Sequence, residues 1–124
     1  MAKILVVDDE EDVRAFLKMH LEDNGHEVVC AKDGSEGSEM LSSFNPDLAI
    51  IDIIMPHHSG IKLIEEIRND KNMFFPVIIL SAVVRYREQY EEHFRILDPP
   101  VTFVDKPFDT GRLIDTITGL LDKQ

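Results

Sequence analysis

Residues 4–12 read ILVVDDEED, an apolar run of four residues followed by five consecutive acidic side chains. The apolar run has no polar residue within it, which is typical of a β-strand that is buried on both faces. Strands of this kind occur in parallel sheets that helices cover on both sides. Asp8 and Asp9 therefore stand where such a strand would leave the core.

Four more apolar runs of the same kind follow along the chain, at residues 28–30 (VVC), 48–51 (LAII), 77–80 (VIIL) and 101–104 (VTFV). Between the runs, apolar residues recur every three or four positions, which predicts amphipathic helices. The predicted helical faces are Val13, Phe16, Leu17 and Leu21; Met40, Leu41 and Phe44; Ile61, Ile64 and Ile67; Tyr86, Tyr90, Phe94 and Leu97; and Leu113, Ile114, Ile117, Leu120 and Leu121. This alternation predicts an α/β fold with a five-stranded parallel sheet between two layers of helices.

The residues between these segments agree with the predicted helix ends. Asn24-Gly25 is a typical helix terminator, and Asp33 with Glu36 three residues later forms the pattern of a capping box. Ser59 and Asp109 are expected to begin the third and fifth helices as N-caps. No linker, repeat or low-complexity segment interrupts the chain, so we expect one domain over residues 1–124.

The composition excludes several classes of protein. The chain has 124 residues, a single cysteine and a net charge of −11. One cysteine excludes an internal disulfide framework, and Cys30 is expected to be a buried apolar residue in a reducing compartment. The net negative charge argues against binding of a nucleic-acid backbone by this chain. No apolar run reaches the roughly 18 residues of a membrane span, and we expect a cytoplasmic protein with no membrane contact.

Four of the five predicted strands, the first, third, fourth and fifth, are followed by residues that carry charge or a hydroxyl group. Parallel sheets of this type bind ligands outside the carboxyl ends of their strands. The residues at those ends are Asp8, Asp9, Asp52, Ser81, Asp105, Lys106 and Pro107. Carboxylate oxygens suit Mg²⁺, and a lysine and a hydroxyl could bind the oxygens of a phosphoryl group. Such a site could hydrolyse a phosphate ester, or one carboxylate could itself be phosphorylated, and the residues alone leave both open.

These residues resemble the receiver domain of bacterial response regulators, the CheY-like superfamily of two-component signalling. The matching segments are residues 4–10 (ILVVDDE), 47–56 (DLAIIDIIMP) with Gly60, 77–82 (VIILSA) and 103–108 (FVDKPF). They occur in the family's order and reach from the first strand to the last helix. The resemblance implies a doubly wound, flavodoxin-like (βα)5 sandwich with strand order 2-1-3-4-5.

The resemblance also implies a role for each matching residue. Asp52 is similar to the aspartate that accepts a phosphoryl group from a sensor histidine kinase or a phosphotransfer protein. Asp8, Asp9, Asp52 and the backbone carbonyl of Ile54 resemble the family's Mg²⁺ site. Lys106 resembles the lysine that contacts the phosphoryl group, while Ser81 and Phe103 resemble the two switch residues.

The implied activity is that of a regulatory switch rather than of a turnover enzyme. Phosphorylation would change the surface around the fourth helix, fifth strand and fifth helix, and that surface would act on a downstream protein or an effector domain. A phosphorylation-dependent homodimer is a further implied state. A Mg²⁺-dependent phosphohydrolase and a receiver-like adaptor that is not phosphorylated are the alternatives.

Four features depart from the pattern or remain outside it. The segment 97–100 (LDPP) replaces the family's usual small-residue turn, so the fourth helix and the output surface could differ in shape. His57 and His58 are expected to be solvated loop residues. Apolar residues at Ile54 and Val83, where relatives can carry polar side chains, predict slow self-dephosphorylation. Glu10, Glu11 and Asp12 are interpreted as the acidic first turn of a helix.

Overall fold

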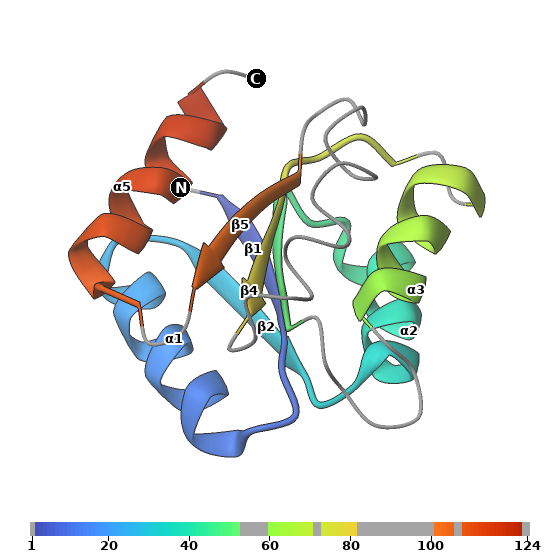
Figure 1. Cartoon of the computed structure of the whole chain (residues 1–124), viewed down its shortest axis with the longest axis horizontal. Coiled ribbons are helices and arrows are strands. Elements are labelled where there is room, and N and C mark those ends of the chain that lie inside the picture. The colour runs from blue at the N-terminus through green and yellow to red at the C-terminus, as the bar shows by residue number, and fades with distance from the viewer. Residues whose placement is uncertain (1, 53–59, 71–72, 82–100, 106–107, 123–124) are drawn as a thin grey trace.

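The chain alternates strands and helices around one parallel sheet (Figure 1). The computed structural model describes residues 2–52, 60–70, 73–81, 101–105 and 108–122, with only the backbone of Ile61, Asp70 and Ser81. The strands are β1 (Lys3–Val7), β2 (Glu27–Ala31), β3 (Leu48–Asp52), β4 (Val77–Ser81) and β5 (Val101–Asp105). The helices are α1 (Glu11–Asp23), α2 (Gly34–Phe44), α3 (Gly60–Glu65), the π-helix η1 (Glu66–Asp70) and α5 (Thr110–Asp122). The helix predicted over 86–97 lies outside the described residues.

The five strands form one sheet in the order β2-β1-β3-β4-β5, and each pair of neighbours is parallel. This is the predicted doubly wound arrangement. In the register, Val7 pairs with Ile51, Asp52 with Leu80, and Ser81 with Asp105. The ends of β1, β3, β4 and β5 therefore meet at the same edge of the sheet.

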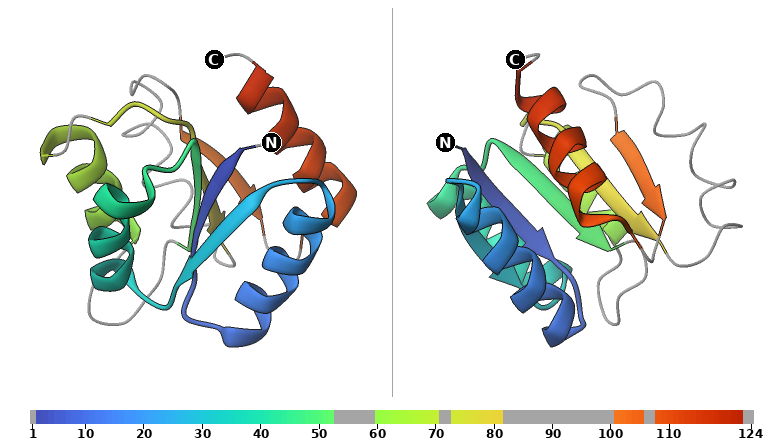
Figure 2. Two further views of the ribbon diagram at one scale, coloured as in Figure 1. Left: turned by 180° about the vertical axis from the view of Figure 1, so that it is seen from behind. Right: turned by 90° about the vertical axis from the view of Figure 1, so that its left-hand side faces the viewer.

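Helices cover the sheet on both faces, as Figure 2 shows from two sides. On one face, α1 and α5 pack over a cluster that includes Ile4, Val6 and Ile50. On the other face, α2 and α3 pack over a cluster that includes Leu5 and Val7. Neighbouring residues of one strand thus serve opposite faces, which explains why the strands are apolar without alternation.

The helix ends predicted at Asn24-Gly25, Asp33 and Asp109 are confirmed. Asn24 caps the end of α1, and Gly25 follows with a φ of 87°, a conformation that favours glycine. Asp33 is the N-cap of α2, and its Oδ1 accepts a hydrogen bond from the backbone N–H of Glu36 at 2.8 Å. The Oδ1 of Asp109 accepts from the N–H of Arg112 at 3.0 Å, so Asp109 caps α5. Ser59 lies outside the described residues.

The capping box of α2 differs from the predicted form in one bond. Oε1 of Glu36 accepts from the backbone N–H of Lys32 at 3.2 Å, one residue before the N-cap. A standard capping box would use the N–H of Asp33. The side chain still satisfies a backbone donor near the start of the helix.

Phe16 and Cys30 lie closer to the surface than predicted. Phe16 is 40% exposed on α1, although Leu17 and Leu21 on the same helix are buried as predicted. Its ring lies against His20 and Phe108, with centroid distances of 4.3 Å and 6.2 Å. Cys30 is half-buried rather than buried, because β2 is an edge strand. Among the described helices, none combines the length and the apolar character that crossing a membrane requires.

Candidate functional site at the carboxyl edge of the sheet

Asp8 follows β1 directly and is fully buried, with an exposed fraction of 0%. Its backbone N–H donates to the carbonyl of Ala31 at 3.1 Å, which extends the pairing of β1 with β2 by one residue. Its Oδ1 accepts a hydrogen bond from the N–H of Glu10 at 2.9 Å. Its backbone carbonyl accepts one from Nη1 of Arg14 at 2.7 Å. These bonds hold the end of β1 and the start of α1 in one fixed turn.

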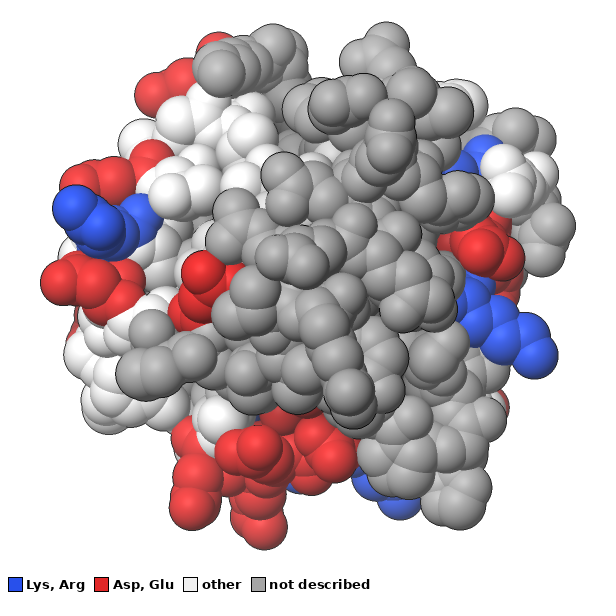
Figure 3. Space-filling model, in the orientation of Figure 1, with Lys and Arg blue, Asp and Glu red and all other residues white. Residues whose placement is uncertain are grey.

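The same turn brings together the carboxylates of Asp8, Asp9 and Glu10, whose ligand oxygens lie within 4.8 Å of one another. Asp9 and Glu10 are exposed beside the buried Asp8. Acidic side chains gather at the lower edge of the view in Figure 3, where Figure 1 shows the start of α1. A group of oxygen ligands of this kind matches the donors that Mg²⁺ prefers.

Glu10 differs from its predicted place. The sequence predicts it in the first helical turn, but it is the N-cap of α1 with an extended backbone, and its side chain makes no capping bond. Glu11 and Asp12 do lie in the first turn, as predicted. The signal that could have identified Glu10 is its place two residues after Asp8, because an aspartate often accepts a bond from the backbone two residues later.

Asp52 is the last residue of β3, the central strand, and its exposed fraction is only 6%. Strand pairing holds it beside Leu80 of β4, and Val7, the residue before Asp8, pairs with the preceding Ile51. Burial of a carboxylate is costly unless hydrogen bonds or a cation compensate for it. A buried acid at the edge where Asp8 and Asp9 also lie is therefore suited to chemistry with a cation and a phosphoryl group.

The remaining predicted site residues are described only in part. Ser81 ends β4, and its backbone pairs with Asp105 of β5, which places Ser81 at the same edge as Asp52. Phe103 of β5 is half-buried and lines a cavity of about 420 Å³ between β5 and α5, together with Phe108, Arg112 and Leu113. The predicted residues outside the described ranges are Lys106, Pro107, Ile54, His57, His58 and Val83, together with residues 97–100.

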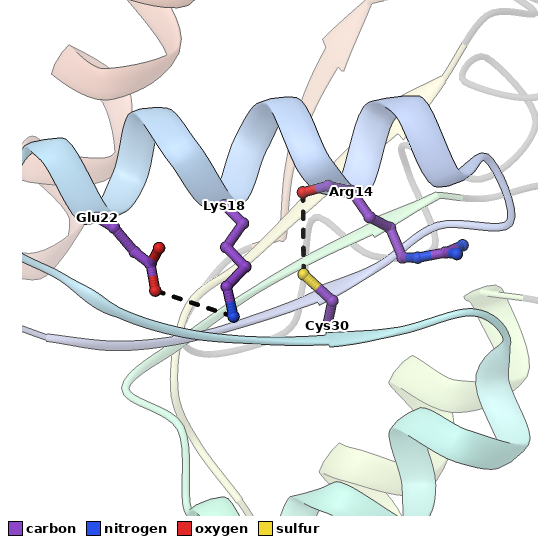
Figure 4. A network of polar contacts seen from close by, with 4 residues as sticks. All are labelled: Arg14, Lys18, Glu22 and Cys30. Atoms are coloured by element: carbon purple, nitrogen blue, oxygen red, sulfur yellow. Dashed lines mark hydrogen bonds and ion pairs between the residues drawn. The ribbon is translucent and has the colours of Figure 1, made fainter.

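Arg14, Lys18 and Glu22 lie along the side of α1 that faces Cys30 of β2 (Figure 4). The Sγ of Cys30 contacts the carbonyl oxygen of Arg14 at 3.9 Å, and Lys18 forms an exposed ion pair with Glu22 at 3.9 Å. Burial raises the pKa of the Cys30 thiol, and the positive charges of Lys18 and Arg14 oppose that shift in part. Cys30 is thus a packing residue with a weakly nucleophilic thiol.

Comparison with known proteins gives one consistent result. A family model described as the response regulator receiver domain matches residues 4–118. The chain is 40% identical over 119 residues to the alkaline phosphatase synthesis transcriptional regulatory protein PhoP of Bacillus subtilis, covering 96% of this chain and 48% of that protein. It is 32% identical over 122 residues to the virulence transcriptional regulatory protein PhoP of Salmonella typhimurium, covering 98% and 52%. The chain thus spans about half the length of the curated relatives it matches.

Solved structures of similar proteins have the same fold. The receiver domain of a Francisella response regulator superposes with a TM-score of 0.85 at 32% identity, covering 99% of this chain and 98% of that one. The response regulator TrrA of Thermotoga maritima, solved in complex with Mg²⁺ and BeF, gives a TM-score of 0.83 at 35% identity, covering 97% and 99%.

Proposed function

Because this chain belongs to the response regulator receiver domain family of bacterial two-component systems, we propose that Asp52 is its phosphoryl acceptor. The observation that carries the proposal is the buried carboxylate of Asp52 at the sheet edge where Asp8 and Asp9 also lie. The donor is the phosphohistidine of a sensor kinase or of a phosphotransfer protein. Residues 1–124 act as one receiver domain in this proposal.

The transfer makes one bond and breaks one. An oxygen of the Asp52 carboxylate attacks phosphorus, an acyl phosphate forms, and the bond between phosphorus and the donor's histidine nitrogen breaks. The electron pair of that bond stays on the imidazole nitrogen. Carboxylates are established nucleophiles for phosphoryl groups. In this proposal the phosphorylated protein is the signalling state, and the protein serves as a regulatory acceptor rather than as a turnover enzyme.

The carboxylates of Asp8, Asp9 and Asp52 and the carbonyl of Ile54 are proposed to hold Mg²⁺, which when bound offsets negative charge on the phosphoryl oxygens. Hydrogen bonds through the backbone of Asp8 and through its Oδ1 hold this residue in place at the end of β1. Glu10 adds negative potential from the side of α1. Lys106 is proposed to contact the phosphoryl group.

Phosphorylation would replace the single negative charge of the Asp52 carboxylate with the nearly two negative charges of a phosphoryl group at the end of β3. In the proposal, the hydroxyl of Ser81 turns toward the phosphoryl oxygens and the ring of Phe103 changes its rotamer. The surface formed by the predicted fourth helix, β5 and α5 then changes its affinity for a partner. That partner is a downstream protein, an effector domain or a second copy of the chain. The proposed setting is the cytoplasm. The comparisons do not favour the phosphohydrolase or the adaptor.

The experiment is phosphorylation by acetyl phosphate followed by intact-mass measurement. With Mg²⁺, the wild type should gain the mass of one phosphoryl group, and it should gain none without Mg²⁺. Asp52→Asn should gain none in either condition. Asp47→Asn is the matched control, because Asp47 precedes the same strand at the opposite edge of the sheet. Its Oδ2 accepts a hydrogen bond from the backbone N–H of Lys3 at 2.8 Å. A wild type without an adduct, or an adduct on Asp52→Asn, would contradict the proposal.

The metal component has a separate test. In thermal unfolding at constant ionic strength, Mg²⁺ should raise the Tm of the wild type, since a ligand that binds the folded state stabilises it. Asp8→Asn should lose most of this increase, whereas Asp47→Asn should keep it. Equal Mg²⁺-dependent increases in the wild type and in Asp8→Asn would place the metal elsewhere.

A further inference from the structure

Gly60 is the first residue of α3 and is buried directly against the backbone of Asp52. A Cβ atom at position 60 would overlap the carbonyl oxygen of Asp52. It would also lie 3.1 Å from the carbonyl carbon of Asp52 and 2.9 Å from Cγ2 of Ile51. The start of α3 therefore packs on the peptide group of the proposed acceptor, with no room for a methyl group between them.

Compared with Gly25, Gly37, Gly111 and Gly119, Gly60 alone makes this kind of approach. A Cβ at Gly25 or Gly119 would meet nothing within 4 Å, and at Gly37 it would meet side-chain methyl groups of Val7 and Leu63 at 3.1 Å and 3.2 Å. The φ of Gly60 is not in the left-handed region, so its backbone freedom is not the reason for a glycine. The reason is close approach to a second backbone segment.

Neither partner in this contact can move easily. On one side, β3 is the central strand, with β1 and β4 hydrogen-bonded to its two edges. On the other side, α3 places Leu63 and Ile64 in the core with exposed fractions of 0%. Packed interiors transmit a displacement rather than absorb it. An added methyl group at position 60 would therefore shift the residue that carries the proposed nucleophile.

We propose that Gly60 is a positioning residue for Asp52: its lack of a side chain lets α3 set the place of the Asp52 peptide, and through it the carboxylate. This inference rests on the proposed function of Asp52. Small displacements of a reacting group are costly, about a hundredfold in rate for a shift on the order of 1 Å. Gly60→Ala should accordingly lower the maximum rate of phosphorylation by about tenfold or more while the domain still folds.

The test compares Gly60→Ala with Gly37→Ala, a second buried helical glycine whose new methyl group would press on side chains instead of on the Asp52 backbone. Both variants and the wild type are incubated with acetyl phosphate and Mg²⁺ at about 10 °C. The rate of adduct formation is measured by intact mass at several acetyl phosphate concentrations. Each rate is divided by the folded fraction from circular dichroism, so that loss of stability alone does not change it. A parallel set contains trimethylamine N-oxide, which favours the folded state.

The expected result is a maximum rate that falls by about tenfold or more in Gly60→Ala and stays within about twofold of the wild type in Gly37→Ala. Equal normalised rates in the two variants would overturn the inference and leave the proposed function intact. The inference also fails if Gly60→Ala stays unfolded with trimethylamine N-oxide while Gly37→Ala folds, because Gly60 would then serve the fold as a whole. A wild type without an adduct would instead mark failure of the proposed function.

Discussion

Arg14 ties the start of α1 to the backbone at the end of β1. Its Nη1 lies 2.7 Å from the carbonyl oxygen of Asp8, and its own carbonyl meets the thiol of Cys30. A hydrogen bond from a charged donor contributes about 1.5–3 kcal/mol when buried, and less when the donor is half-exposed, as here.

We therefore expect Arg14→Gln to lower the free energy of unfolding by about 1 kcal/mol in urea titrations. Lys18→Gln is the matched control, one helical turn later, because the side chains of its ion pair with Glu22 are 49% and 48% exposed. Exposed pairs contribute about 0–1 kcal/mol, so that variant should stay within about 0.5 kcal/mol of the wild type. Similar decreases in the free energy of unfolding of both variants would show that the hydrogen bond from Arg14 to Asp8 contributes no more to stability than the exposed ion pair.

His26 predicts a pH dependence of stability. Its Nδ1 accepts a hydrogen bond from the backbone N–H of Ala2 at 3.2 Å, and that bond requires the nitrogen to be unprotonated. Burial lowers the pKa of His26 from its ordinary value of 6.5. The unfolded chain therefore binds the proton more readily than the folded protein between these two pKa values. The contribution of a neutral His26 to stability is complete above the unfolded pKa and is lost as the pH falls below it toward the folded pKa.

The measurement is the free energy of unfolding of the wild type and of His26→Gln at several pH values between about 5 and 8, around the unfolded pKa. The difference, wild type minus variant, should decrease as the pH falls through that range. A difference that stays constant would show that the titration of His26 is not linked to folding.

At the scale of single elements, helix α2 depends on its N-cap. Replacing an N-cap aspartate with alanine costs about 0.5–2 kcal/mol, since a backbone donor at the helix start loses its partner. We expect Asp33→Ala to lower the free energy of unfolding by about 1 kcal/mol and Asp33→Asn to change it by a few tenths. Chemical denaturation measures the free energy of unfolding of both variants. Equal losses in the two variants would indicate that the negative charge of Asp33, rather than its hydrogen bond to Glu36, stabilises the helix.

The sequence predicts the elements well where burial leaves an apolar pattern, and less well where the pattern stops. All five strands lie where the apolar runs indicate, but β1 and β2 each begin one residue earlier, at Lys3 and Glu27. These two residues pair with each other at the exposed amino edge, where strand pairing needs no apolar side chain. The π-helix η1 was not predicted, because the buried Ile64 and Ile67 have a spacing that suits a continuous α-helix equally well.

The candidate site likewise has a part that the sequence predicts and a part that it does not. Asp8 and Asp52 could be located from the sequence because each follows a buried strand, and parallel strand ends share one edge. The grouping of Glu10 with Asp8 depends on a turn, and the role of Gly60 depends on contact between two segments. Neither relation leaves a periodic pattern in the sequence.

At the scale of the whole molecule, the negative charge is concentrated in one half of the chain. Residues 1–60 contain 13 acidic and 4 basic side chains, a charge of −9, and residues 61–124 contain 11 and 9, a charge of −2, which together make the net −11. Like charges repel in the compact state, and salt screens them. We expect Tm to rise by a few degrees as NaCl increases from about 10 mM to about 0.1 M, where the screening length falls from about 30 Å to about 10 Å.

The double variant Glu11→Gln/Asp12→Asn should show a smaller salt-dependent increase than Glu65→Gln/Asp115→Asn. Both remove two exposed charges, but only the first pair lies in the acidic half. Differential scanning fluorimetry can measure all three proteins side by side. An equal salt response in the two double variants would show that the total charge matters and its distribution does not.

The two ends of the described chain lie side by side. Ala2 and Asp122 line one cavity of about 300 Å³, beyond the amino ends of the strands. Asp52 lies at the other end of a five-residue strand, about 13 Å from its first residue at 3.3 Å per residue. A tether or reporter attached at either end therefore begins at the amino edge of the sheet, opposite the acidic edge. A short linker between the two ends would allow circular permutation with the acidic edge left open.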